Sequence, residues 1–69
     1  MRFFEAFQTV NTGGIDHPGE QIIINLDCVE CFEPASKQTA LVYMKSGMRH
    51  GIFMSYEDFR NLFSDQLLT

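Results

Sequence analysis

The sequence of 69 residues has little positive charge and no long hydrophobic run. It contains five Lys and Arg against nine Asp and Glu, which gives a formal net charge of −4. Non-specific binding to nucleic acid depends on cations that neutralise phosphates, so this composition disfavours a nucleic-acid partner. No apolar segment approaches the roughly 20 residues that a bilayer-spanning helix needs. Because Glu5 and Gln8 interrupt the apolar N-terminal stretch, we expect neither a membrane segment nor a signal peptide.

Cysteine is also scarce. The two cysteines, Cys28 and Cys31, occur without a secretory signal, which indicates a reducing cytoplasm. Their Cys-x-x-Cys spacing is that of zinc sites and redox pairs. In a β-strand, however, this spacing places the two thiols on opposite faces, and a four-ligand site would need both His17 and His50. We therefore expect two small packed residues, with no metal and no other cofactor.

Motifs for catalysis are missing as well. No serine lies in a nucleophile elbow. Asp16-His17 has the composition of an acid–base pair but lies in a segment typical of a solvated loop. The acidic row of Asp27, Glu30 and Glu33 would need a cleft, which so short a chain rarely forms alone. The sequence favours a protein that is not an enzyme.

What the chain has in excess is apolar surface. Hydrophobic residues make up 45% of the sequence and include seven Phe and two Tyr. A domain of about 60 residues buries only about 60% of the surface of its unfolded chain. We expect a single domain over residues 1–69, part of whose apolar surface is covered by an oligomer or a partner.

The segment 22–33 organises the fold. Ile22, Ile23 and Ile24 are stiff at χ1 and suit a pleated, buried strand. Asn25 and Asp27 hydrogen-bond nearby backbone and favour a corner. A second strand follows, with residues 29, 31 and 33 on one face and residues 28, 30 and 32 on the other. Pro34 is expected to end it.

The remaining elements follow from periodicity. Residues 2–10 predict a first strand, residues 11–19 a mobile Gly-rich loop, and residues 38–45 and 48–54 a hairpin that turns at Ser46-Gly47. Ser55 begins a helix with a motif close to a capping box. Its apolar stripe of Phe59, Leu62, Phe63 and Leu67 favours packing on the sheet.

These elements predict an α+β fold, an antiparallel sheet of four or five strands with one C-terminal helix packed on it. The expected core is Phe4, Val10, Ile22, Ile24, Val29, Phe32, Leu41, Tyr43, Ile52, Phe59, Leu62 and Phe63.

Residues 24–33, Ile-Asn-Leu-Asp-Cys-Val-Glu-Cys-Phe-Glu, precede a strand, a Gly47 turn, a second strand and a short helix. This order resembles the small flagellar FlbD-type (swarming-motility) family, whose pattern short uncharacterised bacterial and phage proteins share. The match covers residues 22–56. The extra N-terminal strand, the Gly-rich loop, the longer helix and Ser46-Gly47 in place of Asn-Gly depart from it. The resemblance implies a compact β-sheet protein that acts by binding, with no catalytic residues to transfer.

Two binding functions remain open. The first is a small non-catalytic protein-binding module or inhibitor, a homo-oligomer in which Phe3 and Phe7 of the first strand contact the partner. The second is a binder of a small anionic ligand such as a nucleotide, which in a phage would sequester a defence signal. Its charge would come from Lys45, Arg49, His50 and Arg60, and its stacking surface from Tyr43 or Phe53.

Overall fold

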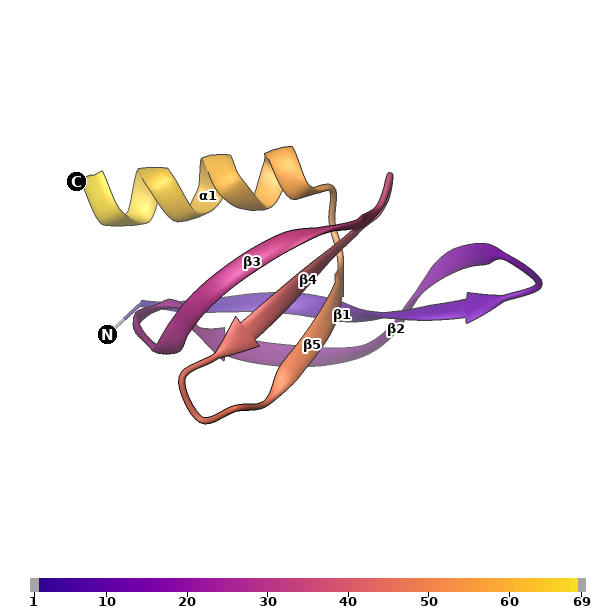
Figure 1. Ribbon diagram of the computed structural model, residues 1–69, viewed down its shortest axis with the longest axis horizontal. Coiled ribbons are helices and arrows are strands. Elements are labelled where there is room, and N and C mark those ends of the chain that lie inside the picture. The colour runs from indigo at the N-terminus through magenta and orange to yellow at the C-terminus, as the bar shows by residue number, and fades with distance from the viewer. Residues whose placement is uncertain (1, 69) are drawn as a thin grey trace.

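The computed structural model describes residues 2–68, without the side chains of Phe63 and of residues 65–68. Its elements are β1 (Phe3–Thr12), β2 (Ile15–Asn25), the 3-10 turn η1 (Leu26–Cys28), β3 (Val29–Ser36), β4 (Thr39–Met44), β5 (Arg49–Phe53) and α1 (Tyr56–Leu68). The strands form one antiparallel sheet in the order β2-β1-β5-β4-β3 (Figure 1). The predicted α+β fold is confirmed.

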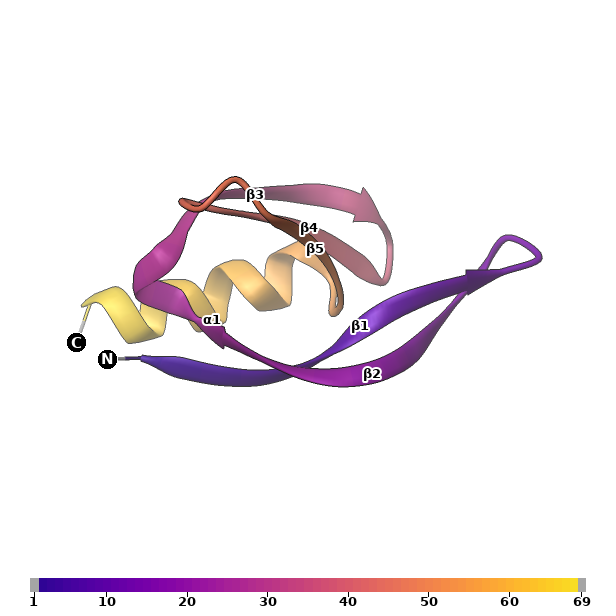
Figure 2. The same ribbon diagram turned by 90° about the horizontal axis from the view of Figure 1, so that it is seen from below.

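The sheet consists of two layers that meet at a narrow junction. β1 and β5 are joined through a single residue pair, Gln8 opposite Ile52. The β1–β2 hairpin therefore diverges from the β3–β4–β5 layer, and the two layers enclose the core (Figure 2). α1 lies against β3 and β4 and contributes Phe59, which is fully buried.

The predicted loop over residues 11–19 is wrong, because the hairpin continues through it. β1 and β2 turn over only two residues, Gly13 and Gly14, with φ of 60° and 82°. Positive φ at both positions is what a tight hairpin turn requires, and glycine adopts it without strain. Pro18 fits because β2 is an edge strand. Residues 11–19 resemble a loop in sequence because Gly, Pro, Asn and Asp interrupt the alternation of apolar and polar residues by which a strand is recognised.

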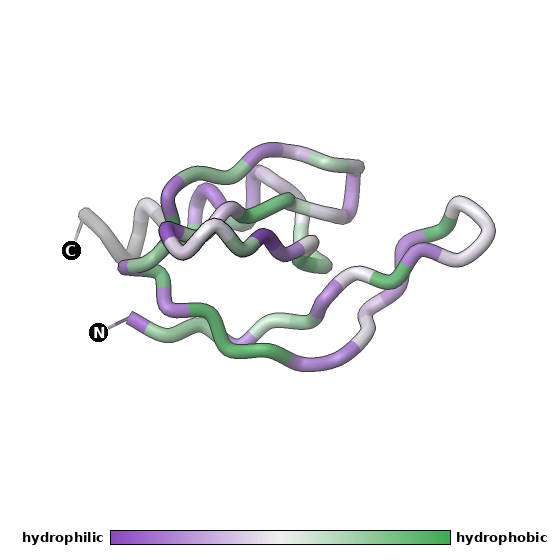
Figure 3. Tube along the Cα trace, turned by 60° about the horizontal axis from the view of Figure 1, so that its bottom comes forward, coloured by the Kyte–Doolittle hydropathy of each residue, from purple (hydrophilic) through white to green (hydrophobic). Residues whose placement is uncertain are grey.

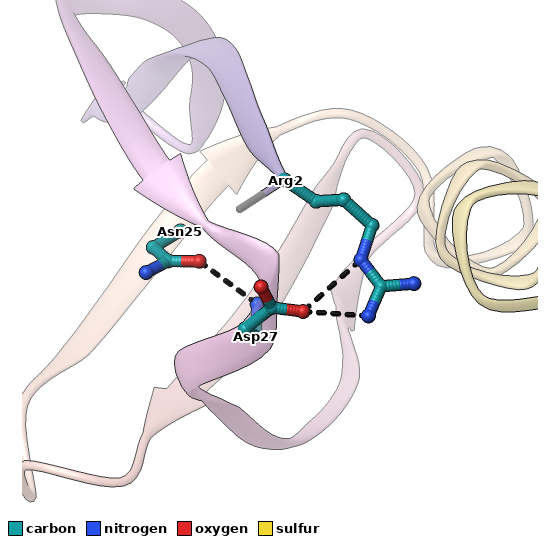
Figure 4. A network of polar contacts seen from close by, with 3 residues as sticks. All are labelled: Arg2, Asn25 and Asp27. Atoms are coloured by element: carbon teal, nitrogen blue, oxygen red, sulfur yellow. Dashed lines mark hydrogen bonds and ion pairs between the residues drawn. The ribbon is translucent and has the colours of Figure 1, made fainter.

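The corner predicted at Asn25 and Asp27 is confirmed. The Asn25 side-chain oxygen accepts a hydrogen bond from the Asp27 backbone N–H at 3.0 Å, at the start of η1 (Figure 4). The Arg2 guanidinium donates to one Asp27 carboxylate oxygen from Nε (3.0 Å) and from the second nitrogen (2.7 Å). These bonds lower the pKa of Asp27. At this corner the chain passes from the β1–β2 layer to the β3–β4–β5 layer.

The strand after the corner differs from the prediction in its alternation and its end. A register shift between Val29 and Cys31 lets both Val29 and Phe32 face the core, although their separation is odd. The predicted division of faces is therefore wrong. Pro34 does not end β3, which continues to Ser36. β3 is the other edge of the sheet, where the missing proline N–H costs no ladder bond.

The β4–β5 hairpin and the helix start agree with the prediction. Ala40, Val42 and Ile52 are fully buried on one face. Gly47 has a φ of 94° in the turn. The Ser55 hydroxyl accepts the Asp58 N–H at 3.1 Å, which caps α1.

Among the side chains that the structure describes, eight buried apolar residues form the core: Ala6, Ile24, Leu26, Val29, Ala40, Val42, Ile52 and Phe59. Four of them were predicted, and four more predicted residues pack against the cluster half-buried: Phe4, Ile22, Phe32 and Leu62. Val10 is wrong, since it is 48% exposed. Leu41 and Tyr43 are half-buried outside this cluster, and the side chain of Phe63 lies outside the described residues.

Candidate protein-binding surface

The outer face of the β1–β2 hairpin carries large exposed apolar side chains. Ala6 and Ile24 point into the core, so the residues that alternate with them point outward. Phe3 is 60% exposed, Phe7 47% and Ile23 64%. We use the name outer face for the six residues Phe3, Glu5, Phe7, Gln21, Ile23 and Asn25. The hydrophobic stretch of β2 lies in the edge strand of the sheet (Figure 3).

Polar groups on this face are bonded to each other. Gln21 donates to the Glu5 carboxylate at 3.0 Å, across the two strands. Glu5 lies directly opposite Ile23 in the register, between Phe3 and Phe7. The face is therefore an apolar patch around one neutral–anionic hydrogen bond, with no cation among its six residues. Such a composition suits contact with another apolar protein surface.

Phe3 and Phe7 were predicted to contact a partner, and the structure brings them together with Ile23. The sequence reasoning missed Ile23, because a run of three isoleucines hides the alternation that buries Ile24 and exposes its neighbour. Glu5 of β1, which lies opposite Ile23, could have indicated this exposure. A carboxylate marks the solvent side of a pair of strands that is buried on one face only.

The predicted anion-binding residues are divided between different surfaces. Tyr43 and Arg49 lie opposite each other on the outer side of β4 and β5. The Tyr43 hydroxyl donates to Glu33 at 2.8 Å, and this bond raises the pKa of Tyr43. Among the described residues, Tyr43 and Arg49 are the only aromatic and cationic members of the predicted set that lie opposite each other. The carboxylate of Glu33 lies next to this pair. An anionic ligand there would meet a negative charge.

The other members of that set lie elsewhere. His50 pairs with buried Val42 and belongs to the opposite face of β5. Phe53 is four residues from Arg49, which is about 13 Å along a strand. Lys45 is in the β4–β5 turn, where its backbone N–H donates to the Cys28 carbonyl at 2.8 Å, and Arg60 is exposed on α1. Their positions give no common site.

A polar cluster joins the hairpin to the β3–β4 turn. Asp16 accepts hydrogen bonds from Ser36, from Asn11 (2.9 Å) and from Thr39 (2.7 Å), and these three bonds lower its pKa. The Thr39 hydroxyl also bonds Thr9 at 2.9 Å. A hollow of about 400 Å³, open to solvent, lies beside this cluster.

This cluster has the character of a structural tether. Three neighbouring side chains donate hydrogen bonds to Asp16 and stabilise its ionised form, which makes this carboxylate a weak base. His17, the other half of the considered acid–base pair, is paired with Val10 on the opposite side of the hairpin. The hollow offers no second acidic or basic group except Lys37 among its lining residues.

Cys28 and Cys31 are both exposed free thiols, so the expectation that they are packed is wrong. The bulge in β3 and the 3-10 turn before it place both outside the core. Across the part of the chain that the structure describes, no group of three or more His, Cys, Asp or Glu side chains could hold a metal ion.

No protein-family model, curated protein or solved structure matches this chain. The similarity to the flagellar family therefore stays a prediction from residues 22–56. Among the described residues, no helix is long and apolar enough to cross a membrane.

Proposed function

We propose that this protein is a small non-catalytic binding module that acts through the outer face of β1–β2 and assembles with copies of itself. The observation that carries the proposal is the exposure of Phe3, Phe7 and Ile23 on one side of one hairpin. Large aromatic side chains in water are a cost to a monomer that contact with a protein surface removes.

The size of the patch sets the expected strength. Its three side chains expose roughly 300 Å² of apolar surface, given the 150–250 Å² of a phenylalanine. Covered on two copies, this amounts to about 600 Å² in total, below the roughly 1,200–2,000 Å² that a stable protein–protein interface buries. The patch alone therefore gives weak association, and a stable assembly needs a further contact.

Light scattering over a range of micromolar concentrations tests the proposal. We expect a mass above the 7.9 kDa of one chain that rises with concentration. The double substitution Phe3→Ser and Phe7→Ser should weaken the association and lower the mass at each concentration, with an unchanged circular dichroism spectrum, because neither residue belongs to the core.

Met48→Ser is the matched control. Met48 is 60% exposed, like Phe3, but lies in the β4–β5 turn away from the hairpin. Its substitution should leave the mass unchanged. A wild-type protein that stays a monomer at every concentration would contradict the proposed self-association.

A further inference from the structure

The two edges of the sheet differ in how they are protected. β2 and β3 are the outermost strands. β3 contains Pro34, two register shifts and the exposed carboxylates Glu30 and Glu33. Proline, bulges and charges are devices that prevent an edge from pairing with another strand. The half of β2 from residue 21 to residue 25 has none of them.

The hydrogen-bond phase of β2 follows from one contact. The Leu26 N–H donates to the Arg2 carbonyl at 2.7 Å, so Arg2 and Leu26 form an antiparallel pair of the hydrogen-bonded kind. The pairs of Ile24 with Phe4 and of Ile22 with Ala6 are of the same kind, since the two kinds alternate. The backbone groups of Gln21, Ile23 and Asn25 therefore point away from β1, toward the open edge.

This edge is free within residues 2–68, where β2 pairs with β1 alone. It presents the N–H groups of Gln21, Ile23 and Asn25 and the carbonyls of Gln21 and Ile23, while the Asn25 carbonyl, at the N-cap of η1, accepts the first hydrogen bond of that turn. The side chains above that row are Gln21, Ile23 and Asn25, all uncharged and all part of the outer face. The free edge and the apolar patch are thus continuous through Ile23, which is 64% exposed.

We infer that a second copy of this chain pairs with the β2 edge, antiparallel, about a two-fold axis at Ile23. This inference rests on the proposed self-association and specifies its contact. Ile23 would lie opposite the partner's Ile23, and Gln21 opposite the partner's Asn25. The arrangement forms about four backbone hydrogen bonds, two between the Ile23 residues of the two copies and one at each Gln21–Asn25 pair.

A second copy fits this edge because the segment is complementary to itself. A two-fold contact uses the same patch on both subunits, and residues 21–25 place an isoleucine against an isoleucine and an amide against an amide, with no like charges opposed. The pairing also makes the two outer faces one surface, with Phe3, Phe7 and Ile23 of both copies on the same side, so it enlarges the apolar patch without covering it. A second such pair packed face to face would cover this surface, and the edge contact supplies the further contact that the patch alone lacks.

Amide hydrogen exchange measured by NMR at low and high protein concentration tests the inference directly. Within the monomer, the amides of Ile22 and Ile24 are bonded to β1 and should be protected at both concentrations. The amides of Ile23 and Asn25 should exchange fast when dilute and slow by about tenfold or more on association, because a paired amide exchanges only after local opening. This alternation at single-residue spacing is specific to edge pairing.

Two substitutions at one position separate backbone from side chain. Ile23→Pro removes an N–H that points outward, so it should leave the β1–β2 pairing intact and abolish association. Ile23→Thr keeps the N–H and the branched side chain, and should retain association. Circular dichroism establishes that each variant is folded, and the exchange experiment on the wild type stands if Ile23→Pro does not fold.

The outcomes are distinct. If the protein associates but residues 23 and 25 exchange fast at every concentration, edge pairing is overturned and the proposed function stands on the outer face alone. If Ile23→Pro is folded and associates like the wild type, edge pairing is likewise overturned. If the wild type is a monomer throughout, both the inference and the proposed self-association fail, and the open edge is left to a different partner.

Discussion

The sheet has two outer surfaces of opposite character. On β1–β2, the side away from the core exposes Phe3, Phe7 and Ile23. On β3–β5, the corresponding side carries Glu33, Tyr43 and Arg49, with a hydrogen bond between the first two. Both surfaces are the outer sides of layers that enclose the same core, so packing of the core alone does not explain why their outward-facing residues differ. The aromatic residue Tyr43 on β3–β5 has a polar partner, whereas Phe3, Phe7 and Ile23 expose apolar side chains that only contact with another surface would remove from water.

The largest effect should come from a phenylalanine that is fully buried in the core. Phe59 is fully buried and lies edge-to-face with Phe32, their ring centres 4.9 Å apart. Phe59→Ala should lower the free energy of unfolding by about 3–5 kcal/mol, because it removes a core side chain and leaves a cavity. Urea denaturation measures this change.

Phe7→Ala is the matched control for that comparison, since the same side chain is removed from the outer face. We expect a much smaller loss, within about 0.5 kcal/mol at a concentration where the protein is dilute. A loss at Phe7 as large as at Phe59 would mean that the outer aromatic residues are structural, and the contrast between the two surfaces would lose its functional meaning.

An intermediate effect is expected where the hairpin bulges. A Cβ added at Gly19 would lie 2.5 Å from Cγ2 of Val10 and 3.1 Å from the Gln8 carbonyl oxygen. Val10 is branched at Cβ and cannot swing away easily. Gly19→Ala should destabilise the protein by about 1–3 kcal/mol through overpacking, as measured by thermal unfolding.

The double variant Gly19→Ala with Val10→Ala should recover part of that loss. Val10 is 48% exposed, so its own truncation costs little. An equal loss in the single and double variants would place the strain in the backbone instead of in the contact with Val10.

Much of the fold was predictable from local chemistry. The Asn25–Asp27 corner, the Gly47 turn, the Ser55 cap and the alternation of β4 each depend on residues close in sequence, and all agree with the structure. Two of the errors involve β-bulges. The shift after Val29 changed which residues of β3 face the core, and the hairpin through residues 11–19 continues past a bulge that no periodicity reveals.

The candidate site was predictable only in part. Phe3 and Phe7 were identified because both faces of their strand are apolar. Ile23 was not, because strand order decides its exposure, and strand order depends on contacts between distant segments. The tether at Asp16 was missed for the same reason, since Ser36 and Thr39 are 20 and 23 residues away in sequence.

A smaller effect concerns the tether between the two layers. Hydrogen bonds from Ser36, Asn11 and Thr39 hold the pKa of Asp16 below its ordinary value of 3.8. A carboxyl group with a lowered pKa in the folded state stabilises the fold fully above its unfolded pKa, and this contribution is lost as the pH falls through the folded value. The melting temperatures of the wild type and of Asp16→Asn should therefore converge below pH 3.8. A constant difference down to the lowest pH would contradict the assigned role of the carboxylate.

The smallest effect should be confined to the polar surface. The hydrogen bond from Tyr43 to Glu33 is the main reason why the pKa of Tyr43 is raised above 10.0, and the charge of Arg49 opposes it. Glu33→Gln should lower that pKa and Arg49→Gln should raise it further, as followed by the ultraviolet absorbance of tyrosinate, with Tyr43→Phe to identify the signal. Neither variant should change the concentration dependence of the mass, because these side chains satisfy each other on β3–β5. If Arg49→Gln weakened association as much as Phe3→Ser with Phe7→Ser, the contact would extend to the polar surface, and the β1–β2 face could no longer be regarded as the separate binding surface of the molecule.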